Sequence, residues 1–385
     1  MKSTERPITD LLRRRLREKA PLIQVLVGPR QVGKTTTLRA ALGSRGVYHS
    51  ADSPASLAPT SIDDWWSEAL RHKDRILAID EVQKIPNWSE SIKKRWDARR
   101  SLKLVVTGSS SLVVEKGLRE TLAGRFELLR AEHWNFSEAR AAFGVSLRKF
   151  VEFGCYPGSM QFLGDLARWA GYVRDSIVEP ALGRDLLQLH PVDQPALLRQ
   201  VFGAAVSLPA QLVSLQKLQG ALQGRGTLPT IANYLRLLAE AFLVSAVDKY
   251  SPNTFRSRRS VPKLVVHDNA LVRAFERPVD TPISTERLGH YLENQIGARF
   301  IEAGWETYYW KDRDLEVDFV VIGPRNERWA VEVKTTKTSI RELRGILEFQ
   351  KRHKDFEACL VTLAGQKVEG VRTLDVEEIL SLKRV

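Results

Sequence analysis

The feature that most constrains this chain is one glycine-bounded segment, Gly28-Pro-Arg-Gln-Val-Gly33-Lys34-Thr35. It follows an apolar run from Leu22 to Val27 and precedes a helix-forming segment from Thr36 to Leu42. The spacing fits the phosphate-loop pattern G-x-x-x-x-G-K-[ST], which needs a strand before it and a helix after it. The alternative is a glycine-rich turn that happens to carry Lys-Thr. The strand and helix context favours an α/β domain with a nucleotide site.

The residue types of this loop suit a chain of phosphates. Gly28 and Gly33 let the backbone turn tightly, so that successive N–H groups and the helix N-terminus face an anion. Lys34 would reach the β and γ phosphates of ATP, and the Thr35 hydroxyl would ligate Mg²⁺. The residues predicted to bind nucleotide are Gly28, Pro29, Arg30, Gln31, Val32, Gly33, Lys34, Thr35 and Thr36.

Composition places the chain among globular proteins. At 385 residues it should hold two or three domains, and 43% hydrophobic with 27% charged residues argues against disorder. No apolar run is long enough to span a bilayer, and the N-terminal residues lack the apolar core of a signal peptide, so we expect a cytoplasmic location and no membrane partner. With only Cys155 and Cys359, a disulfide framework and a cysteine-based zinc site are both excluded.

The net charge of +13 and the pI near 9.8 indicate an anionic partner. Nucleic acid is the obvious candidate for a phosphate-loop protein. The alternative is a protein that is simply basic. Residues 13–17 carry four arginines among leucines at helical spacing, which predicts an amphipathic helix with a solvated basic face.

A second apolar strand, from Arg75 to Ile79, ends in Asp80 and Glu81. Acids at the carboxyl end of a buried parallel strand belong to the ligand crevice of the sheet. We expect Asp80 to hold Mg²⁺ together with Thr35, and Glu81 to polarise the attacking water. The alternative is a pair of acids that cap the next helix.

Two further candidates follow along the chain. The strand from Leu102 to Val106 ends in a hydroxyl-rich turn, where Ser109 or Thr107 could contact the γ-phosphate or orient water. Arg125 could reach the nucleotide of a neighbouring subunit and stabilise the transition state, or it could instead satisfy carbonyls at a helix end. The predicted catalytic residues are thus Lys34, Glu81, Ser109 and Arg125.

The ordered segments GPRQVGKTT, LAIDEVQKIPNW, VVTGSSS, LAGR and HWNFSEA resemble bacterial and archaeal AAA+-type ATPases with a C-terminal nuclease-like domain. The likeness continues through Phe153 to Gly158, where Cys155 stands in place of the second glycine of the family's Gly-Gly-Tyr-Pro turn, and through Arg184-Asp185. This resemblance implies ATP and Mg²⁺ as cofactors. It also implies a homo-oligomeric ring, usually a hexamer, with the site at the subunit junction.

The middle of the chain reads as three helices and a hairpin. Helices are expected at 197–206, 214–222 and 229–238, with Thr227 as a cap, and strands at 243–249 and 263–267. This is the plan of a winged helix, in which Arg256, Arg258 and Arg259 of the wing would contact DNA phosphates. The alternative is a packing module between domains.

The last hundred residues carry a second group of acids. A helix from Thr285 to Glu302 is expected, followed by strands at 305–310, 315–322 and 328–333, a helix at 339–351 and a strand at 358–363. Two adjacent strands would bring Asp318, Glu332 and Lys334 together, a set that binds Mg²⁺ and activates water against a phosphodiester. The set resembles the PD-(D/E)XK nuclease fold, with Glu293 matching the helix acid of the Holliday-junction resolvase branch. An ion-pair ladder on a solvated sheet is the alternative.

The sequence therefore predicts an α/β protein of four segments. These are a P-loop AAA+-type parallel-sheet domain (1–135), a helical lid or linker (136–194), a winged-helix unit (195–280) and a PD-(D/E)XK-like α/β domain (281–385). The leading hypothesis is an ATP-driven motor that remodels, translocates along or branch-migrates duplex or branched DNA. The alternatives are a Mg²⁺-dependent endonuclease with a regulatory ATPase, and a nucleotide-switched scaffold without enzymatic activity.

Overall fold

The computed structural model describes all residues except 1–4, 20–21, 53–60, 99–101, 109–117, 119, 190–191, 223–225, 253–259 and 385. The chain divides into two compact units. The first comprises Met1–Glu132 and Arg184–Pro191, and the second comprises His133–Gly183 and Val192–Val385.

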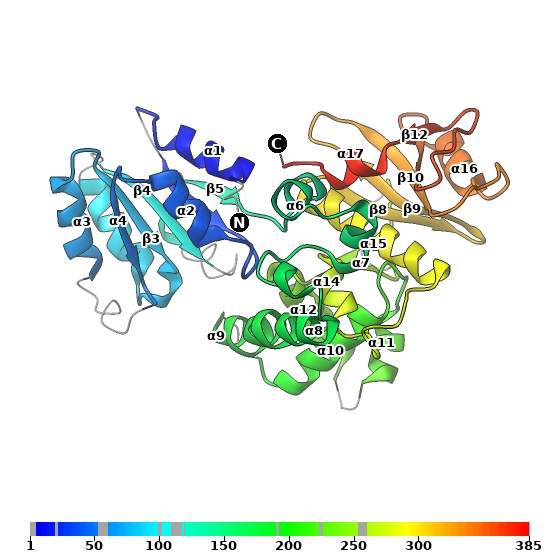
Figure 1. Ribbon diagram of the computed structural model, residues 1–385, viewed down its shortest axis with the longest axis horizontal. Coiled ribbons are helices and arrows are strands. Elements are labelled where there is room, and N and C mark those ends of the chain that lie inside the picture. The colour runs from blue at the N-terminus through cyan, green and yellow to red at the C-terminus, as the bar shows by residue number, and fades with distance from the viewer. Residues whose placement is uncertain are drawn as a thin grey trace. The chain divides into compact units, whose positions relative to one another are not determined.

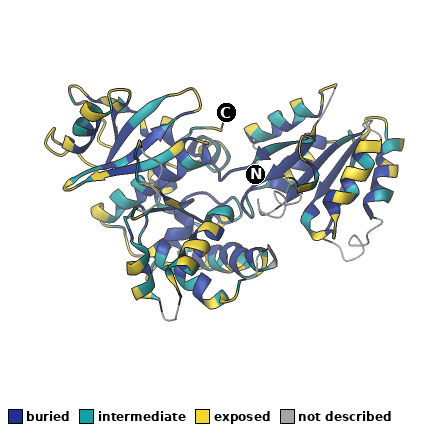
Figure 2. Cartoon of the chain, turned by 180° about the vertical axis from the view of Figure 1, so that it is seen from behind, coloured by how far each residue is buried: buried dark blue, intermediate teal, exposed yellow. Residues whose placement is uncertain are grey.

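The first unit is built on a five-stranded parallel sheet with the order β2-β3-β4-β1-β5. Its strands are β1 (Ile23–Val27), β2 (Val47–Ser50), β3 (Ile76–Asp80), β4 (Lys103–Gly108) and β5 (Phe126–Arg130). Every residue of β1 and β3 is buried, as expected for parallel strands that are covered on both faces. Figure 2 shows these inner strands in dark blue. The predicted parallel-sheet domain is confirmed.

Helices cover both faces of this sheet (Figure 1). On one face α3 (Ser61–Arg71) and α4 (Trp88–Ala98) share an apolar core with β1, β3 and β4. On the other, α1 (Pro7–Arg15) and α2 (Lys34–Leu42) pack against each other and reach β5 and β3. Two short helices, η2 (Val82–Lys84) and α9 (Leu186–Leu189), also belong to this unit.

The predicted basic amphipathic helix is α1. Leu12 and Leu16 are buried beneath it, while Arg14 is exposed. Arg13 pairs with Asp10 at 3.1 Å and also with Glu5. The basic face of α1 is thus partly neutralised by acids of its own chain.

The second unit begins with a helical segment. Its elements are α6 (Phe136–Phe143), α7 (Leu147–Phe153), η3 (Met160–Phe162), α8 (Leu166–Tyr172), η4 (Val173–Val178) and η5 (Ala181–Asp185), the last of which ends in the first unit. Asn135 and Glu138 form a capping box at the start of α6, which satisfies two backbone N–H groups of the first turn. The predicted helix from Arg168 to Leu182 is present as α-helical and π-helical stretches in succession.

Three helices and a hairpin follow, in the predicted order. They are α10 (Pro195–Ser207), α11 (Leu215–Ala221), α12 (Leu228–Glu240) and the antiparallel strands β6 (Val244–Val247) and β7 (Lys263–Val266). Thr227 caps α12 by accepting the N–H of Thr230, as predicted. The three wing arginines, Arg256, Arg258 and Arg259, lie outside the described residues. The winged-helix interpretation stays a prediction.

The C-terminal part of this unit contains a mixed sheet with the order β12-β11-β10-β9-β8. Its elements are α14 (Asn269–Arg273), α15 (Thr285–Glu302), β8 (Glu306–Asp312), β9 (Leu315–Ile322), β10 (Arg328–Lys334), α16 (Arg344–Arg352), β11 (Glu357–Thr362), β12 (Arg372–Leu374) and α17 (Val376–Leu380). The predicted start of α16 at Ser339 is wrong. Glu342 accepts the N–H and hydroxyl of Ser339 and the hydroxyl of Thr338, and these local bonds form a turn in place of the first helical turn.

The turn after α7 depends on a close approach between Gly154 and Asp268. Gly154 has φ of 58°, and a Cβ atom there would lie 1.7 Å from Oδ1 of Asp268. The other oxygen of Asp268 accepts the N–H of Cys155 at 3.0 Å. Cys155 is buried and is not among the residues with positive φ, so the second glycine of the family turn is not required.

We expect Gly154→Ala to lower the free energy of unfolding by about 1–3 kcal/mol or more, because the methyl group displaces Asp268 and the backbone is in a left-handed conformation. Gly289→Ala in α15 is the matched control, since a Cβ atom there meets nothing within 4 Å. Thermal unfolding of the full chain measures both, and equal midpoints for the two variants would contradict this account.

Candidate functional site

The phosphate-loop segment connects β1 to α2 along a path that needs its two glycines. A Cβ atom on Gly28 would lie 2.0 Å from the carbonyl oxygen of Ala131, which follows β5. Gly33 has φ of 95° and occupies the N-cap of α2, and Gln31 also has a positive φ of 61°. The loop is therefore a tight, left-handed turn that ends on a helix N-terminus, which is the arrangement that binds phosphate.

Lys34 folds back over this loop. Its ammonium donates to the carbonyl oxygens of Gly28 at 2.9 Å and Pro29 at 2.7 Å, and the residue is 6% exposed. Burial lowers the pKa of Lys34 to about 8, because the charged form loses hydration. An anion bound in the loop would supply the compensating charge that the two carbonyl dipoles supply only in part.

Asp80 receives three hydroxyl groups at the carboxyl end of β3. Its Oδ2 accepts from Thr35 at 2.6 Å and from Tyr48 at 2.9 Å, and its Oδ1 accepts from Thr107. Asp80 is 2% exposed. The structure thus brings together Thr35 and Asp80, the two predicted metal ligands.

Glu81 follows Asp80 with a left-handed φ of 56°. Its N–H donates to Oγ1 of Thr107 at 3.1 Å, and its carboxylate accepts from Nε2 of Gln83 at 2.7 Å. The Thr107 hydroxyl therefore positions both acidic residues, because it donates to the carboxylate of Asp80 and accepts from the backbone N–H of Glu81. Ser109, the alternative polar residue of this strand end, lies outside the described residues.

Two contributors were not predicted from sequence. Tyr48 lies on β2, which neighbours β3 in the sheet, so strand order is the signal that would have found it. Asp185 accepts two bonds from Arg30 of the loop, at 3.0 and 2.8 Å. This paired contact raises the pKa of Arg30 and holds its side chain. The Arg184-Asp185 pair was visible in the sequence, but nothing there linked it to the loop.

Arg125 lies away from the phosphate loop of its own chain. Its guanidinium makes two bonds to Asp97, at 2.7 and 2.9 Å. Its carbonyl accepts the N–H of Ile23, which begins β1, whereas the loop follows the end of β1. The two features therefore lie at opposite ends of the sheet's strands, and Arg125 does not join the residues around Lys34.

The four predicted nuclease residues lie in one polar cluster of the second unit. Lys334 contacts Glu332 at 2.7 Å, and Asp318 accepts the N–H of Val333 at 2.8 Å. Glu293 of α15 does not contact these residues directly but pairs with Lys263. Lys263 also lies 3.7 Å from Oδ1 of Asp318.

Burial and the neighbouring charge of Asp318 raise the pKa of both Glu293 and Glu332 well above the ordinary glutamate range. Crowded carboxylates of this kind favour a bound cation or proton. The cluster is therefore more than a solvated ladder of ion pairs, since Asp318, Glu293 and Glu332 have side chains only 15%, 16% and 10% exposed.

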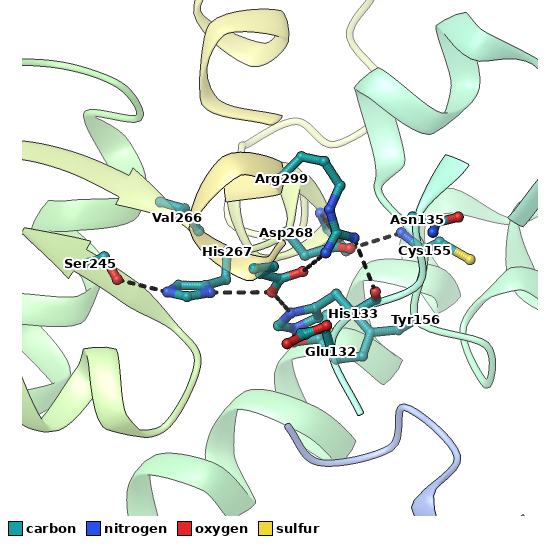
Figure 3. Close-up of polar contacts among 12 residues, drawn as sticks. Glu132, His133, Asn135, Cys155, Tyr156, Ser245, Val266, His267, Asp268 and Arg299 are labelled. Atoms are coloured by element: carbon teal, nitrogen blue, oxygen red, sulfur yellow. Dashed lines mark hydrogen bonds and ion pairs between the residues drawn. The ribbon is translucent and has the colours of Figure 1, made fainter. Parts of the chain in front are cut away.

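A third group, His133, His267 and Glu302, is buried in the second unit. Figure 3 shows His133 and His267 among their polar contacts. Among the described residues, this is the one trio of possible metal ligands whose atoms all lie within 4.8 Å of one another. Glu302 accepts from Nδ1 of both histidines, with His267 at 3.2 Å, and Arg299 lies 3.6 Å from its other oxygen.

The outer ring nitrogens of the trio also have partners. Nε2 of His133 meets the hydroxyl of Tyr156 at 2.8 Å, and Nε2 of His267 meets that of Ser245 at 2.8 Å. Every ring nitrogen and carboxylate oxygen of the trio is paired without an ion. The adjacent guanidinium disfavours a second cation, so we interpret this network as structural.

We expect Thr107→Val to lower kcat for ATP hydrolysis by about tenfold to a hundredfold with little change in nucleotide affinity, because it releases both Asp80 and the backbone of Glu81. Tyr48→Phe is the matched control. It removes one hydroxyl from Asp80 but leaves Glu81 in place, so its effect on kcat should be smaller. Steady-state hydrolysis and equilibrium nucleotide binding measure both. Wild-type kcat in Thr107→Val would show that this bracing is dispensable.

Comparisons with known proteins divide the chain into three parts. Residues 20–140 match the family described as AAA domain. Residues 145–282 and 288–384 match two families that are each described as a domain of unknown function, DUF8612 and DUF4143. A search of curated proteins finds no match to this chain. Every helix among the described residues is too short or too polar to cross a membrane.

Three solved structures are similar to this chain at low TM-scores. The Aeropyrum pernix ORC1 protein in complex with DNA is 13% identical over 70% of this chain and 90% of its own, with a TM-score of 0.30. The Thermotoga maritima RuvB Holliday junction branch migration motor is 16% identical over 62% and 88%, with a TM-score of 0.33. AMPPCP-bound DnaA from Aquifex aeolicus is 16% identical over 60% and 86%, with a TM-score of 0.31. TM-scores this low do not show that this chain shares the fold or the activity of these proteins.

The assignment of the first unit therefore rests on the family match and on the loop. Residues 20–140 match the AAA domain, and the phosphate-loop residues adopt the conformation that binds phosphate. Together these findings identify the first unit as similar to the AAA domain, with a loop whose geometry suits phosphate.

Proposed function

We propose that this protein is an ATP-hydrolysing AAA-type motor that acts on duplex or branched DNA. The single observation that carries the ATP part is the contact of Thr35 with Asp80, beside the phosphate loop and Lys34. This contact joins the end of β3 to the start of α2, which is where the phosphates of a nucleotide and its cation meet in phosphate-loop enzymes.

The donor set at this point fits Mg²⁺, which prefers oxygen ligands from hydroxyls and carboxylates. Thr35 and Asp80 would hold the ion, and when bound with ATP it neutralises charge on the β and γ phosphates. Lys34 would move from the loop carbonyls onto the phosphates. Glu81, the residue after Asp80, would orient the attacking water, and the loop N–H groups would hold the phosphate chain while Asp185 keeps Arg30 in place.

The proposed oligomer is a homo-oligomeric ring, with a hexamer as the first expectation. Arg125 is consistent with it, because this residue lies at the opposite end of the strands from the phosphate loop of its own chain and would act on the site of a neighbour. In the isolated chain Asp97 holds the guanidinium. Assembly would require Arg125 to exchange this partner for the neighbour's nucleotide.

DNA is proposed as the partner on the basis of charge. The chain carries a net charge of +13, and phosphate contacts by lysine and arginine account for most sequence-independent affinity for DNA. The three helices and hairpin of residues 195–280 are proposed as a winged-helix unit, with Arg256, Arg258 and Arg259 as phosphate contacts. Segment 136–194 is proposed as the lid or linker between this unit and the ATPase domain of residues 1–135.

We expect Glu81→Gln to reduce ATP hydrolysis by about a hundredfold or more while ATP still binds, because the amide cannot accept a proton from water. Glu90→Gln, which changes an exposed glutamate of α4, is the control for the loss of a carboxylate. Binding and hydrolysis are measured on the same preparations, with and without Mg²⁺. Full hydrolysis by Glu81→Gln would remove this residue from the mechanism.

The motor is tested by steady-state ATP hydrolysis with no DNA, single strands, duplex and a four-way junction. We expect one DNA form to stimulate hydrolysis selectively, and the stimulation to weaken steeply with added salt because counterions are released on binding. Slow hydrolysis that no DNA form stimulates would instead favour the nucleotide-switched scaffold.

A second candidate function is Mg²⁺-dependent DNA cleavage by residues 281–385, which we propose as a PD-(D/E)XK-like domain. The observation that favours it is the cluster of Asp318, Glu332 and Lys334, in which the two carboxylates are largely buried and the lysine is partly exposed. The two carboxylates fit a divalent cation that activates water, and Lys334 would orient the attacking water or stabilise the phosphodiester charge.

We expect Lys334→Ala to abolish Mg²⁺-dependent cleavage of branched DNA and to leave ATP hydrolysis within about twofold of wild type, because the two sites lie in different units. Lys351→Ala on α16 is the control for a lost surface charge. Cleavage that survives Lys334→Ala would exclude this cluster as the nuclease site.

A further inference from the structure

Lys263 is a buried cation that the sequence patterns did not single out. It is the first residue of β7 and is 1% exposed. Lysine is almost never buried to this extent without an anionic partner. Its ammonium leaves the hairpin and ends in the acidic cluster formed by Glu293, Asp318 and Glu332.

The contacts of the Lys263 ammonium link two elements of the nuclease-like segment. It pairs with Glu293 of α15, donates to the backbone carbonyl of Asp318 at 3.1 Å and lies 3.7 Å from Oδ1 of the same residue. It also lies 4.8 Å from the centre of the Phe319 ring. A cation that meets two carboxylates, a carbonyl and an aromatic face is fully compensated.

The two lysines of the cluster differ in position. Lys334 pairs with Glu332 and has a side chain 31% exposed, whereas the side chain of Lys263 is 1% exposed. Lys334 can therefore meet a ligand from solvent, and Lys263 cannot. Lys263 therefore lies inside the cluster, and Lys334 lies at its solvent-exposed side.

Lys263 also bridges Glu293 and Asp318. Within the described part of the chain, one trio of possible metal ligands has all its ligand atoms within 4.8 Å of one another, and it is His133, His267 and Glu302. The three carboxylates of the acidic cluster are not grouped so closely. Hydrolytic sites with two metal ions place them about 3.5–4 Å apart between shared carboxylates. The ammonium contacts both Glu293 and Asp318, which is the position that an ion shared by these two carboxylates would take.

We propose that Lys263 is a positioning residue of this cluster, a built-in cation that fills one cation position and limits the cluster to a single divalent ion on Asp318 and Glu332. The inference rests on the proposed nuclease-like site and is independent of the ATPase. It also makes the shape of the cluster depend on the β6 and β7 hairpin, because the hairpin delivers the cation.

The test counts bound Mn²⁺ by electron paramagnetic resonance in the nucleotide-free full chain. Asp80→Asn is present in every sample, so that the phosphate-loop site contributes no signal. We expect one Mn²⁺ per chain, and two per chain in Lys263→Met, which removes the charge and keeps most of the side-chain volume. Adding Glu293→Gln to Lys263→Met should return the count to one. Lys217→Met on α11, an exposed lysine of the same unit, should leave the count unchanged.

Each outcome bears on a separate statement. Two ions in the parent chain, or one ion in both the parent and Lys263→Met, would overturn the role of Lys263 while leaving the nuclease-like site in place. No ion in the parent would overturn both. Cleavage activity is not needed for any of these results, so an inactive nuclease does not obscure them.

A folding defect in Lys263→Met is itself informative, because removal of one partner leaves the other charge buried and unpaired. We then expect Mn²⁺ to raise the melting temperature of Lys263→Met by several degrees more than that of the parent. We also expect the double variant with Glu293→Gln to fold without the metal. Equal Mn²⁺ shifts in Lys263→Met and the parent would contradict the proposal.

Discussion

The buried carboxylate of Asp80 is the point on which the first unit depends. It lies at the end of the inner strand β3, at 2% exposure, and accepts hydroxyl groups from three other elements. A carboxylate at this depth is stabilised because these hydroxyl donors replace the water that it has lost. The same donors fix the start of α2, the end of β4 and the middle of β2 around one point. The proposed nucleotide site is therefore assembled around one buried carboxylate, and the sheet holds the contributing elements in place.

Arg30 and Lys34 add a second layer to this arrangement. Both are cations of the phosphate loop, and each has a partner inside its own unit: Asp185 for Arg30, and the loop carbonyls for Lys34. The Arg30 pair is charge-assisted and bidentate, so it fixes the loop strongly. The Lys34 bonds reach neutral carbonyls and are weaker. A bound phosphate chain would thus draw Lys34 from the loop carbonyls far more readily than it would draw Arg30 from Asp185. The Lys34 contact is therefore the mobile one, and the Arg30 contact is the fixed one.

Much of the fold could be predicted because its signals are local. The run from Ile23 to Val27, the two glycines and the strand ending in Asp80 identify the parallel sheet without tertiary information. Thr107 was a candidate from sequence, but its contacts with Asp80 and Glu81 were not predicted. Tyr48 and Asp185 could not be assigned at all, because their roles depend on which strands are neighbours and on a segment more than fifty residues beyond the sheet. The start of α16 was misplaced for a different reason, since side-chain bonds from Glu342 compete with the helix.

The acidic cluster shows the same limit more sharply. Period-two alternation brought Asp318, Glu332 and Lys334 to adjacent strands, and the antiparallel pairing of β9 with β10 agrees with it. Lys263 comes from the preceding hairpin, fifty-five residues before Asp318, and reads in the sequence as an ordinary strand-end lysine. Burial alone distinguishes it. In both units, therefore, buried carboxylates find their hydrogen-bond or ion-pair partners in segments that are distant in the sequence.

The most direct test of the ATPase account is a structure of the protein with Mg²⁺ and a non-hydrolysable ATP analogue. The account predicts that the Lys34 ammonium leaves the carbonyls of Gly28 and Pro29 for the β and γ phosphates, with Mg²⁺ on Thr35 and near Asp80. It also predicts that Arg30 stays on Asp185. A nucleotide bound elsewhere, or one that leaves Lys34 on the loop carbonyls, would contradict the central claim that this loop is the catalytic ATP site.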